Sequence, residues 1–298
     1  MTRYQICMLK RLLTLVAVAL VAFGTVAQPQ LKISELLYEP RSGEAEYVEL
    51  YNGSSVPVEL AGYHIVRVLH DTAATHYPLP EYTVEPHGYV VLTTDVQSVL
   101  ACYSAPHPSR IVECRLPPYP NGGGTVMLAA ADSTVVERFD YAPSMHSPML
   151  RDAHGVSLER RRFDVEVGSA ANWFSASSVC GYGTPGYANS QSAEWLVPEA
   201  DFIFSSELLS PDGDGYQDVL EVEYSMDRSD LMADAVVYDV AGVPVATVLD
   251  AALSGTHGTV VWNPEGMPAG RYLFVLTVYD RGGRRQTLRR TVAVVSQR

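Results

Sequence analysis

The sequence predicts an all-β protein made of antiparallel β-sandwiches. From residue 31 onward, apolar residues mostly alternate with polar ones in short runs that are rich in β-branched and aromatic residues. Turn residues separate these runs, as at 121–124 and 131–133. Beyond the N-terminal stretch, no window keeps a helical period for more than a turn or two. These patterns argue against a helical body.

Length and composition narrow the class of protein further. The chain has 298 residues, of which 47% are hydrophobic, so it can bury one large or two ordinary cores and is not disordered. It carries 21 Lys and Arg residues against 34 Asp and Glu residues, a net charge of −13. Nucleic-acid binding needs clustered Lys and Arg, so we expect no nucleic-acid partner.

The first 27 residues are typical of a cleaved secretory signal peptide. A basic start precedes a 12-residue apolar stretch at 12–23, and Thr25 and Ala27 supply the small residues before a cleavage site. The alternative, a membrane anchor, needs about 20 apolar residues. We therefore expect an exported chain with no transmembrane helix after cleavage, in the periplasm, on the outer cell surface or outside the cell.

The alternating runs fall into two groups. Residues 28–190 are expected to form the first sandwich, with strands at 31–38, 47–51, 63–68, 89–93, 125–130 and 135–141. A stretch rich in Gly, Ser, Asn, Gln and Pro follows, and we place a linker at 191–200. Residues 201–298 have the size of an immunoglobulin-like (Ig-like) unit, with strands at 219–226, 235–240, 243–249, 259–262, 272–279 and 287–295.

Several motifs stand in order along residues 31–190. They are ISELLYEP at 33–40, EYVELYN at 46–52, VELAGY at 58–63, EPHGYVVL at 85–92, SLER at 157–160, NW at 172–173 and GTPG at 183–186. In this order they resemble the bacterial form of the lamin-tail domain. The resemblance implies an Ig-like β-sandwich in an exported protein, acting as an interaction domain. The stretch from 93 to 122 has no counterpart in that pattern.

A second resemblance covers residues 200–298. The motifs LSPDGDGYQD at 209–218, VVYDVAG at 236–242, VW at 261–262 and PAGRY at 268–272 resemble the Ig-like domain of the flagellar hook-capping protein. They also resemble C-terminal modules of type IX secretion, although an acidic loop replaces the usual first strand with Asn-Pro. The predicted fold class is therefore two Ig-like antiparallel β-sandwiches joined by a short linker and preceded by a cleaved signal peptide.

Three cysteines follow the signal peptide. Cys102 and Cys114 flank a Pro-rich segment without strand signals, and in an oxidising compartment we expect them to form a disulfide worth about 3 kcal/mol. Cys180 is then free. The alternative of a nucleophilic cysteine needs a nearby His and an electropositive setting, which the sequence does not indicate.

The best candidate for chemistry is the acidic stretch 212–218. The carboxylates of Asp212, Asp214 and Asp218, with the Tyr216 carbonyl between them, follow the spacing of a calcium loop, so Ca²⁺ is the one cofactor we expect. Glu223 falls at the twelfth position but lies on a predicted strand about 16 Å from Asp218, too far to complete the site. The alternative is an acidic turn in which Asp side chains accept backbone N–H hydrogen bonds.

Two further clusters are candidate sites of metal-assisted hydrolysis. The first comprises Glu35, Glu39, Glu44, Glu46 and Glu49. Because Glu49 shares a strand face with Tyr47 and Tyr51, we expect it to accept hydrogen bonds from a neighbouring loop. The second is His70 and His76 around Asp71, whose spacing matches no established zinc pattern.

No nucleophile elbow, zinc-protease helix or phosphate loop is present in the sequence. We expect a protein that is not an enzyme.

Basic residues gather in two places on this acidic chain. One is Arg160–162, and the other is the C-terminal set Arg281, Arg284, Arg285, Arg289, Arg290 and Arg298. They could dock an anionic envelope polymer or an acidic partner, or simply protect an edge strand.

We therefore expect an exported, non-catalytic envelope or cell-surface protein for adhesion or scaffolding, binding protein or glycan through loops and strand edges. The alternatives are a secretion-system component or cargo with the last domain as its sorting or anchoring signal, and a metal-dependent hydrolase.

Overall fold

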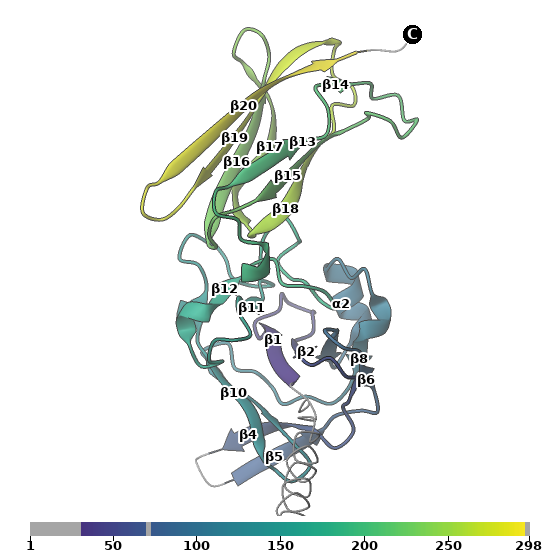
Figure 1. Cartoon of the computed structure of the whole chain (residues 1–298), viewed down its shortest axis with the longest axis vertical. Helices are drawn as coiled ribbons and strands as arrows, with labels where there is room; N and C mark the ends of the chain where they lie inside the picture. Colours follow the sequence, from purple (N-terminus) through teal and green to yellow (C-terminus); the bar gives the residue numbers. More distant parts are fainter. Residues whose placement is uncertain (1–30, 70–72, 296–298) are drawn as a thin grey trace, which may run out of the picture.

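The structure is a computed structural model that describes residues 31–69 and 73–295. The predicted signal peptide at 1–27 lies outside the described residues. The described chain is all-β apart from short helical turns, and its strands form two groups of sheets stacked along the long axis of the molecule (Figure 1). This confirms the predicted fold class of Ig-like antiparallel β-sandwiches. Among the described residues, no helix is long and apolar enough to cross a membrane.

The N-terminal group contains one six-stranded, one four-stranded and one two-stranded sheet. The first has the order β12-β11-β1-β2-β7-β8, the second β10-β9-β4-β5 and the third β3-β6. Their bounds are β1 Leu31–Leu37, β2 Tyr47–Asn52, β3 Val58–Glu59, β4 His64–Leu69, β5 Ala73–Pro78, β6 Thr83–Val84, β7 Tyr89–Thr93, β8 Ile111–Glu113, β9 Gly124–Ala129, β10 Val135–Tyr141, β11 Leu158–Arg160 and β12 Trp173–Ser175.

The larger sheets of this group enclose the main core. Alternate residues of β1, β2 and β7 face inward, and the stacked rings of Phe139 and Trp173 lie 3.7 Å apart within it. The outer face of the six-stranded sheet is covered by helix α2, Val96–Cys102, in a smaller cluster with Tyr47, Val91 and Ile111. Both faces of this sheet are therefore buried near α2.

The C-terminal group is a sandwich of a three-stranded and a five-stranded sheet. Their orders are β13-β15-β18 and β14-β20-β19-β16-β17. Inward residues of both sheets, such as Trp262 and Phe274, form a separate core. The strand bounds are β13 Asp201–Phe204, β14 Leu208–Leu209, β15 Leu220–Ser225, β16 Leu231–Tyr238, β17 Pro244–Ser254, β18 His257–Trp262, β19 Gly270–Tyr279 and β20 Arg285–Val294.

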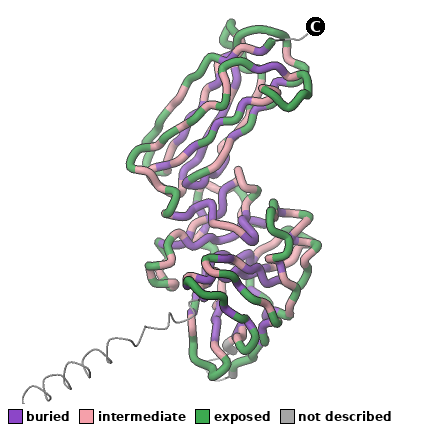
Figure 2. Tube along the Cα trace, turned by 45° about the vertical axis from the view of Figure 1, so that its right-hand side comes forward, coloured by how far each residue is buried: buried purple, intermediate pink, exposed green. Residues whose placement is uncertain are grey.

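Residues 176–192 run between the two groups and are themselves packed. Figure 2 shows a band of buried chain at the junction. Gln191 is fully buried and donates through Nε2 to the carbonyl oxygens of Ser175 and Ser254, which belong to different groups. Further hydrogen bonds cross the junction from Ser178 to Leu253 and from Thr256 to Ser190. We call residues 176–192 the connector.

Candidate functional site

The acidic loop brings its three carboxylates together. One ligand atom from each of Asp212, Asp214 and Asp218 lies within 4.8 Å of the others. Within the described part of the chain, no other group of His, Cys, Asp or Glu converges in this way. Glu223 pairs with Ile203 and Thr259 in the middle of its sheet and does not join the group.

The same carboxylates also shape the loop. Asp218 accepts from the backbone N–H groups of Gly213 and Gly215, both at 2.8 Å, and this lowers the pKa of its carboxyl. Asp214 accepts from the N–H of Tyr216 at 2.7 Å. Gly213 and Gly215 have φ of 80° and 87°, which glycine adopts without a steric cost. The geometry accommodates both predicted arrangements, the capped turn and the cation loop.

A second set of acids is buried at the outer face of the six-stranded sheet. Glu35 lies directly opposite Glu49 on β2 and opposite Glu159 on β11, and all three are fully buried. A bulge in β1 between Ile33 and Glu35 produces this arrangement, because it turns Ile33 into the core and Glu35 to the other face. We call Glu35, Glu49 and Glu159 the glutamate triad.

The triad holds the connector in place. Glu35 accepts from the N–H of Thr184 at 3.0 Å, and Glu49 accepts from the N–H of Gly186 at 2.7 Å. Glu159 accepts from the hydroxyl of Ser190 and the N–H of Gln191, each at 2.8 Å. The expectation that Glu49 accepts hydrogen bonds from a loop is thus confirmed. The triad fixes the segment that reaches the C-terminal group.

The triad shares protons rather than carrying three full charges. The hydroxyl of Thr184 lies 2.9 Å from a Glu35 oxygen and 3.0 Å from a Glu159 oxygen, yet it has one hydrogen to donate. A proton on either carboxyl supplies the missing hydrogen. Burial, followed by the charge of Glu35, raises the pKa of Glu159 to about 8 and raises that of Glu49 well above its usual range. Burial also raises the pKa of Glu35, although its hydrogen bonds to Ser157 and Tyr47 oppose the shift.

The other acids and histidines weighed as hydrolase residues lie elsewhere. Glu46 accepts from the N–H of Tyr119, and its partial burial raises its pKa to about 7. His76 is exposed and its ring lies edge-on to His64, while His70 and Asp71 lie outside the described residues. Glu39 and Glu44 bond surface groups, Asn121 and the N–H of Arg41. These side chains form no common cluster with the triad.

The predicted Cys102–Cys114 disulfide does not form, and all three described cysteines are free thiols. The reason is the sheet between them: Cys102 ends α2 and packs in the outer cluster, whereas Cys114 packs against the main core on the opposite face. Cys180 is half-buried in the connector, and its thiol lies 3.0 Å from the carbonyl oxygen of Ser177. Burial raises the pKa of Cys114 to about 11, so this thiol is unreactive at neutral pH.

Arg160–162 does not form a single basic spot, which corrects the sequence interpretation. Arg160 is 2% exposed and pairs with Glu137 at 2.9 Å. Arg161 lies over the ring of Phe174, and Arg162 pairs with Asp164 at 2.6 Å. The strand β11 ends at Arg160, whose side chain is buried, so only Arg161 and Arg162 reach the surface, where both line a shallow hollow with Lys32.

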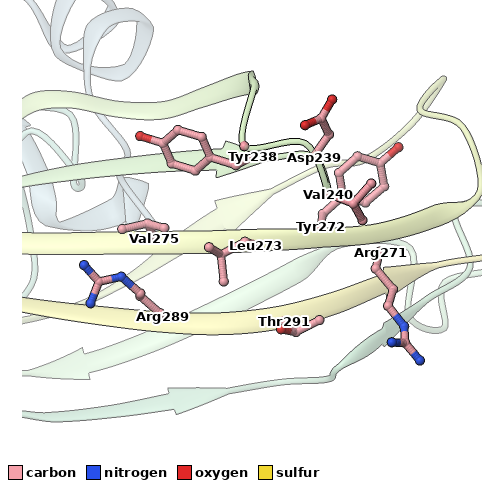
Figure 3. A pocket seen from close by; sticks show the side chains of 10 residues that line it. Tyr238, Asp239, Val240, Arg271, Tyr272, Leu273, Val275, Arg289 and Thr291 are labelled. Carbon is pink, nitrogen blue, oxygen red and sulfur yellow. The ribbon is translucent and has the colours of Figure 1, made fainter.

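The outer face of the five-stranded sheet is open and hollowed. One hollow of about 640 Å³ lies over the middle of β19 and β20, and a second of about 790 Å³ adjoins it toward the start of β20. Both are lined by Tyr238, Val275 and Arg289. Figure 3 shows Arg271 and Arg289 at either end of a floor made by Leu273, Val275 and Thr291. Sequence alternation could have identified this face, since these residues alternate with the core residues of β19 and β20.

Comparison with known proteins identifies a lamin-tail domain in the N-terminal group. The family model for the Lamin Tail Domain matches residues 25–143, less than half of the chain. The resemblance predicted for residues 31–190 is thereby confirmed over that part. No curated protein matches this chain. The predicted resemblance of residues 200–298 to the hook-capping Ig-like domain stays a prediction.

Among solved structures, the chain is similar to the soluble domain of PmoD from Methylocystis sp. ATCC 49242 (Rockwell), with 13% identity and a TM-score of 0.24. This match covers 32% of this chain and 90% of the PmoD domain. It is also similar to dimeric latent PorU from Porphyromonas gingivalis, with 11% identity and a TM-score of 0.26. PorZ, a surface component of the type IX secretion system of the same organism, has 11% identity and a TM-score of 0.23.

The match covers 90% of this chain but 20% of PorU, and 89% of this chain but 39% of PorZ. At these TM-scores, none of the similarities bears on the function of this chain.

Proposed function

We propose that the chain is an exported, non-catalytic protein of a bacterial envelope or cell surface that binds protein or glycan. The observation that carries this proposal is the open outer face of the five-stranded sheet, where three arginines, three aspartates, threonine hydroxyls and a tyrosine ring surround an apolar floor. Sheets of this kind present a broad, rigid surface rather than an enclosed reaction site. The lamin-tail match supports an interaction role for the other half.

Retention on envelope material tests this proposal. Residues 28–298 should bind saturably to cell-envelope fragments in sedimentation, and salt should weaken the binding because charged groups line the face. The hydrolase alternative is tested in the same samples by assaying released sugars and peptides with added Zn²⁺ or Mg²⁺. The proposal would be contradicted if the protein released sugars or peptides in a way that depends on the Glu35 carboxylate and showed no saturable binding to the envelope fragments.

A second proposal concerns the acidic loop, which we propose binds Ca²⁺ through Asp212, Asp214, Asp218 and the Tyr216 carbonyl. The convergence of the three carboxylates favours it. Extracellular calcium modules bind at about 10⁻⁴–10⁻³ M, so 2 mM Ca²⁺ stabilises such a fold by about 1 kcal/mol. We expect the thermal midpoint of residues 28–298 to rise by about 4 °C on replacing EDTA with Ca²⁺.

The Asp214→Asn variant should abolish this calcium-dependent rise. Asp214 is the best residue to replace because Asn keeps the acceptor for the Tyr216 N–H and removes only the charge. Glu223→Gln is the matched control, since it removes a carboxylate just outside the loop and should leave the rise intact. A midpoint in the unmodified chain that is indifferent to Ca²⁺ would leave the capped turn as the loop's role.

A further inference from the structure

Three arginines form a line across the outer face of the five-stranded sheet. Arg285 and Arg289 are four residues apart on β20 and therefore share a face, about 13 Å from each other. Arg271 on β19 lies directly opposite Ala293 of β20, which is four residues beyond Arg289. The Cα atoms of the three residues thus follow one another at nearly equal steps of about 13 Å along the sheet. We call Arg271, Arg285 and Arg289 the arginine line.

The arginine line forms no ion pair with the described part of the chain. Among the described residues, none of its three side chains forms an ion pair or hydrogen bond, whereas nearby Arg228 pairs with Asp280 and Arg290 pairs with Glu207. Three aspartates also line the two hollows, but Asp234 lies on β16, Asp250 on β17 and Asp239 in the turn after β16, so none comes from β19 or β20. Asp234 accepts from the N–H of Ala251 at 2.7 Å, and Asp239 accepts from two N–H groups of its own turn. The β19–β20 side of the hollows therefore carries arginines and no carboxylate, on a protein of net charge −13.

The surface between the arginines is suited to binding a chain of sugar rings. The floor is narrow and apolar, with Val236 opposite Val275 and Tyr238 opposite Leu273. Thr287 and Thr291 alternate with the arginines along β20 and present hydroxyls on the same side. A protein interface of stable size needs a broader apolar centre than these few side chains provide. A sugar ring can pack its C–H face on Tyr238 and hydrogen-bond to the threonines.

We propose that the arginine line binds an anionic polysaccharide, lying along β20, through carboxylate or sulfate groups that accept paired hydrogen bonds from the guanidinium groups. This inference rests on the proposed function and names the site and ligand class. The overall negative charge of the protein repels polyanions, so binding must come from a local positive strip such as the arginine line on β19 and β20.

The test measures binding of residues 28–298 to polygalacturonate and to heparin, with neutral dextran as a control, in 50 mM salt. The Arg285→Gln/Arg289→Gln variant should weaken binding to the anionic polymers at least about tenfold. The matched control is Arg281→Gln/Arg284→Gln, which removes the same charge from the turn beside β20 and should change affinity less than twofold. Comparing polygalacturonate with heparin separates carboxylate from sulfate recognition.

Equal losses in the two double variants would overturn the inference, because they would indicate general charge attraction. Tighter binding of poly-glutamate than of either polysaccharide would also overturn it, in favour of an acidic protein partner. So would concentration-dependent self-association that Arg285→Gln/Arg289→Gln abolishes. If envelope retention persists in that variant, the inference fails while the proposed function stands; if the unmodified chain is not retained, the proposed function fails.

Discussion

Replacing Arg160 with Met is expected to destabilise the N-terminal group by about 3–5 kcal/mol. Arg160 lies in the core, where its Nη1 donates to both oxygens of Glu137 at 2.9 Å and its Nη2 donates to the carbonyl oxygen of Val165 at 2.8 Å. Without the guanidinium, Glu137 remains as a buried charge with only Lys32 at 3.7 Å to compensate it. Urea unfolding of residues 28–298 at pH 7 measures the loss.

The double variant Glu137→Gln/Arg160→Met should recover part of that loss. Gln keeps an acceptor for the N–H of Ile33, which lies 2.6 Å from Glu137, and leaves no uncompensated charge. Arg162→Met is the matched control, because Arg162 pairs with Asp164 in solvent and such pairs contribute little. If Arg160→Met and Arg162→Met unfold at the same urea concentration, the buried pair is not what holds this part of the core.

Alternation predicted the long strands well because one face of each is buried. Each of the twelve predicted segments overlaps a strand of the structure. The strands that alternation missed are short or lack an apolar face, such as β5 with its exposed residues 74–76 and the two-residue β3 and β6. The parallel pairings of β7 with β8 and of β14 with β20 depend on long-range contacts that local patterns do not encode.

The functional surfaces were predicted only in part. Spacing identified Asp212, Asp214 and Asp218 because their convergence is local. The glutamate triad could not be predicted, because it depends on two features that the sequence does not display. One is the bulge that turns Glu35 outward, and the other is the pairing of β1 with β11, which places Glu159 beside Glu35. The arginine-rich C-terminus was recognised, but which arginines share a face depends on the register of β19 and β20.

Stability is expected to fall as pH rises from 6.5 to 8, because the triad loses a proton. The pKa of Glu159 is raised to about 8 in the folded chain, against an ordinary value near 4.5, so the folded state binds more protons than the unfolded state in this range. A raised carboxyl pKa contributes stability at low pH and loses it as pH passes through the folded pKa. The slope for one group is at most about 1.4 kcal/mol per pH unit.

The pH range of this prediction begins at 6.5 because, below that pH, the titration of His146 changes the stability in the opposite direction. Burial lowers the pKa of His146 to about 4, so stability rises with pH between 4 and 6.5 on its account. Glu46, with a pKa raised to about 7, adds to the decline only until the pH has passed about 7. Unfolding free energies of residues 28–298 at pH 6.5, 7, 7.5 and 8 define the slope.

Glu159→Gln should flatten this slope and leave the chain more stable than the unmodified protein at pH 8. The Gln amide oxygen can accept from Ser190 and Gln191, and its NH₂ can donate to the Thr184 hydroxyl, as the protonated acid does. The exposed Glu166→Gln control should keep the full slope. An unchanged slope in Glu159→Gln would mean that the connector is held without the proton shared between Glu35 and Glu159. A flattened slope in Glu159→Gln would mean that the hydrogen bonds from Glu159 to Ser190 and Gln191 depend on pH. These two connector residues also bond to Thr256 and Ser254, so the contact between the two groups of sheets would then depend on pH as well.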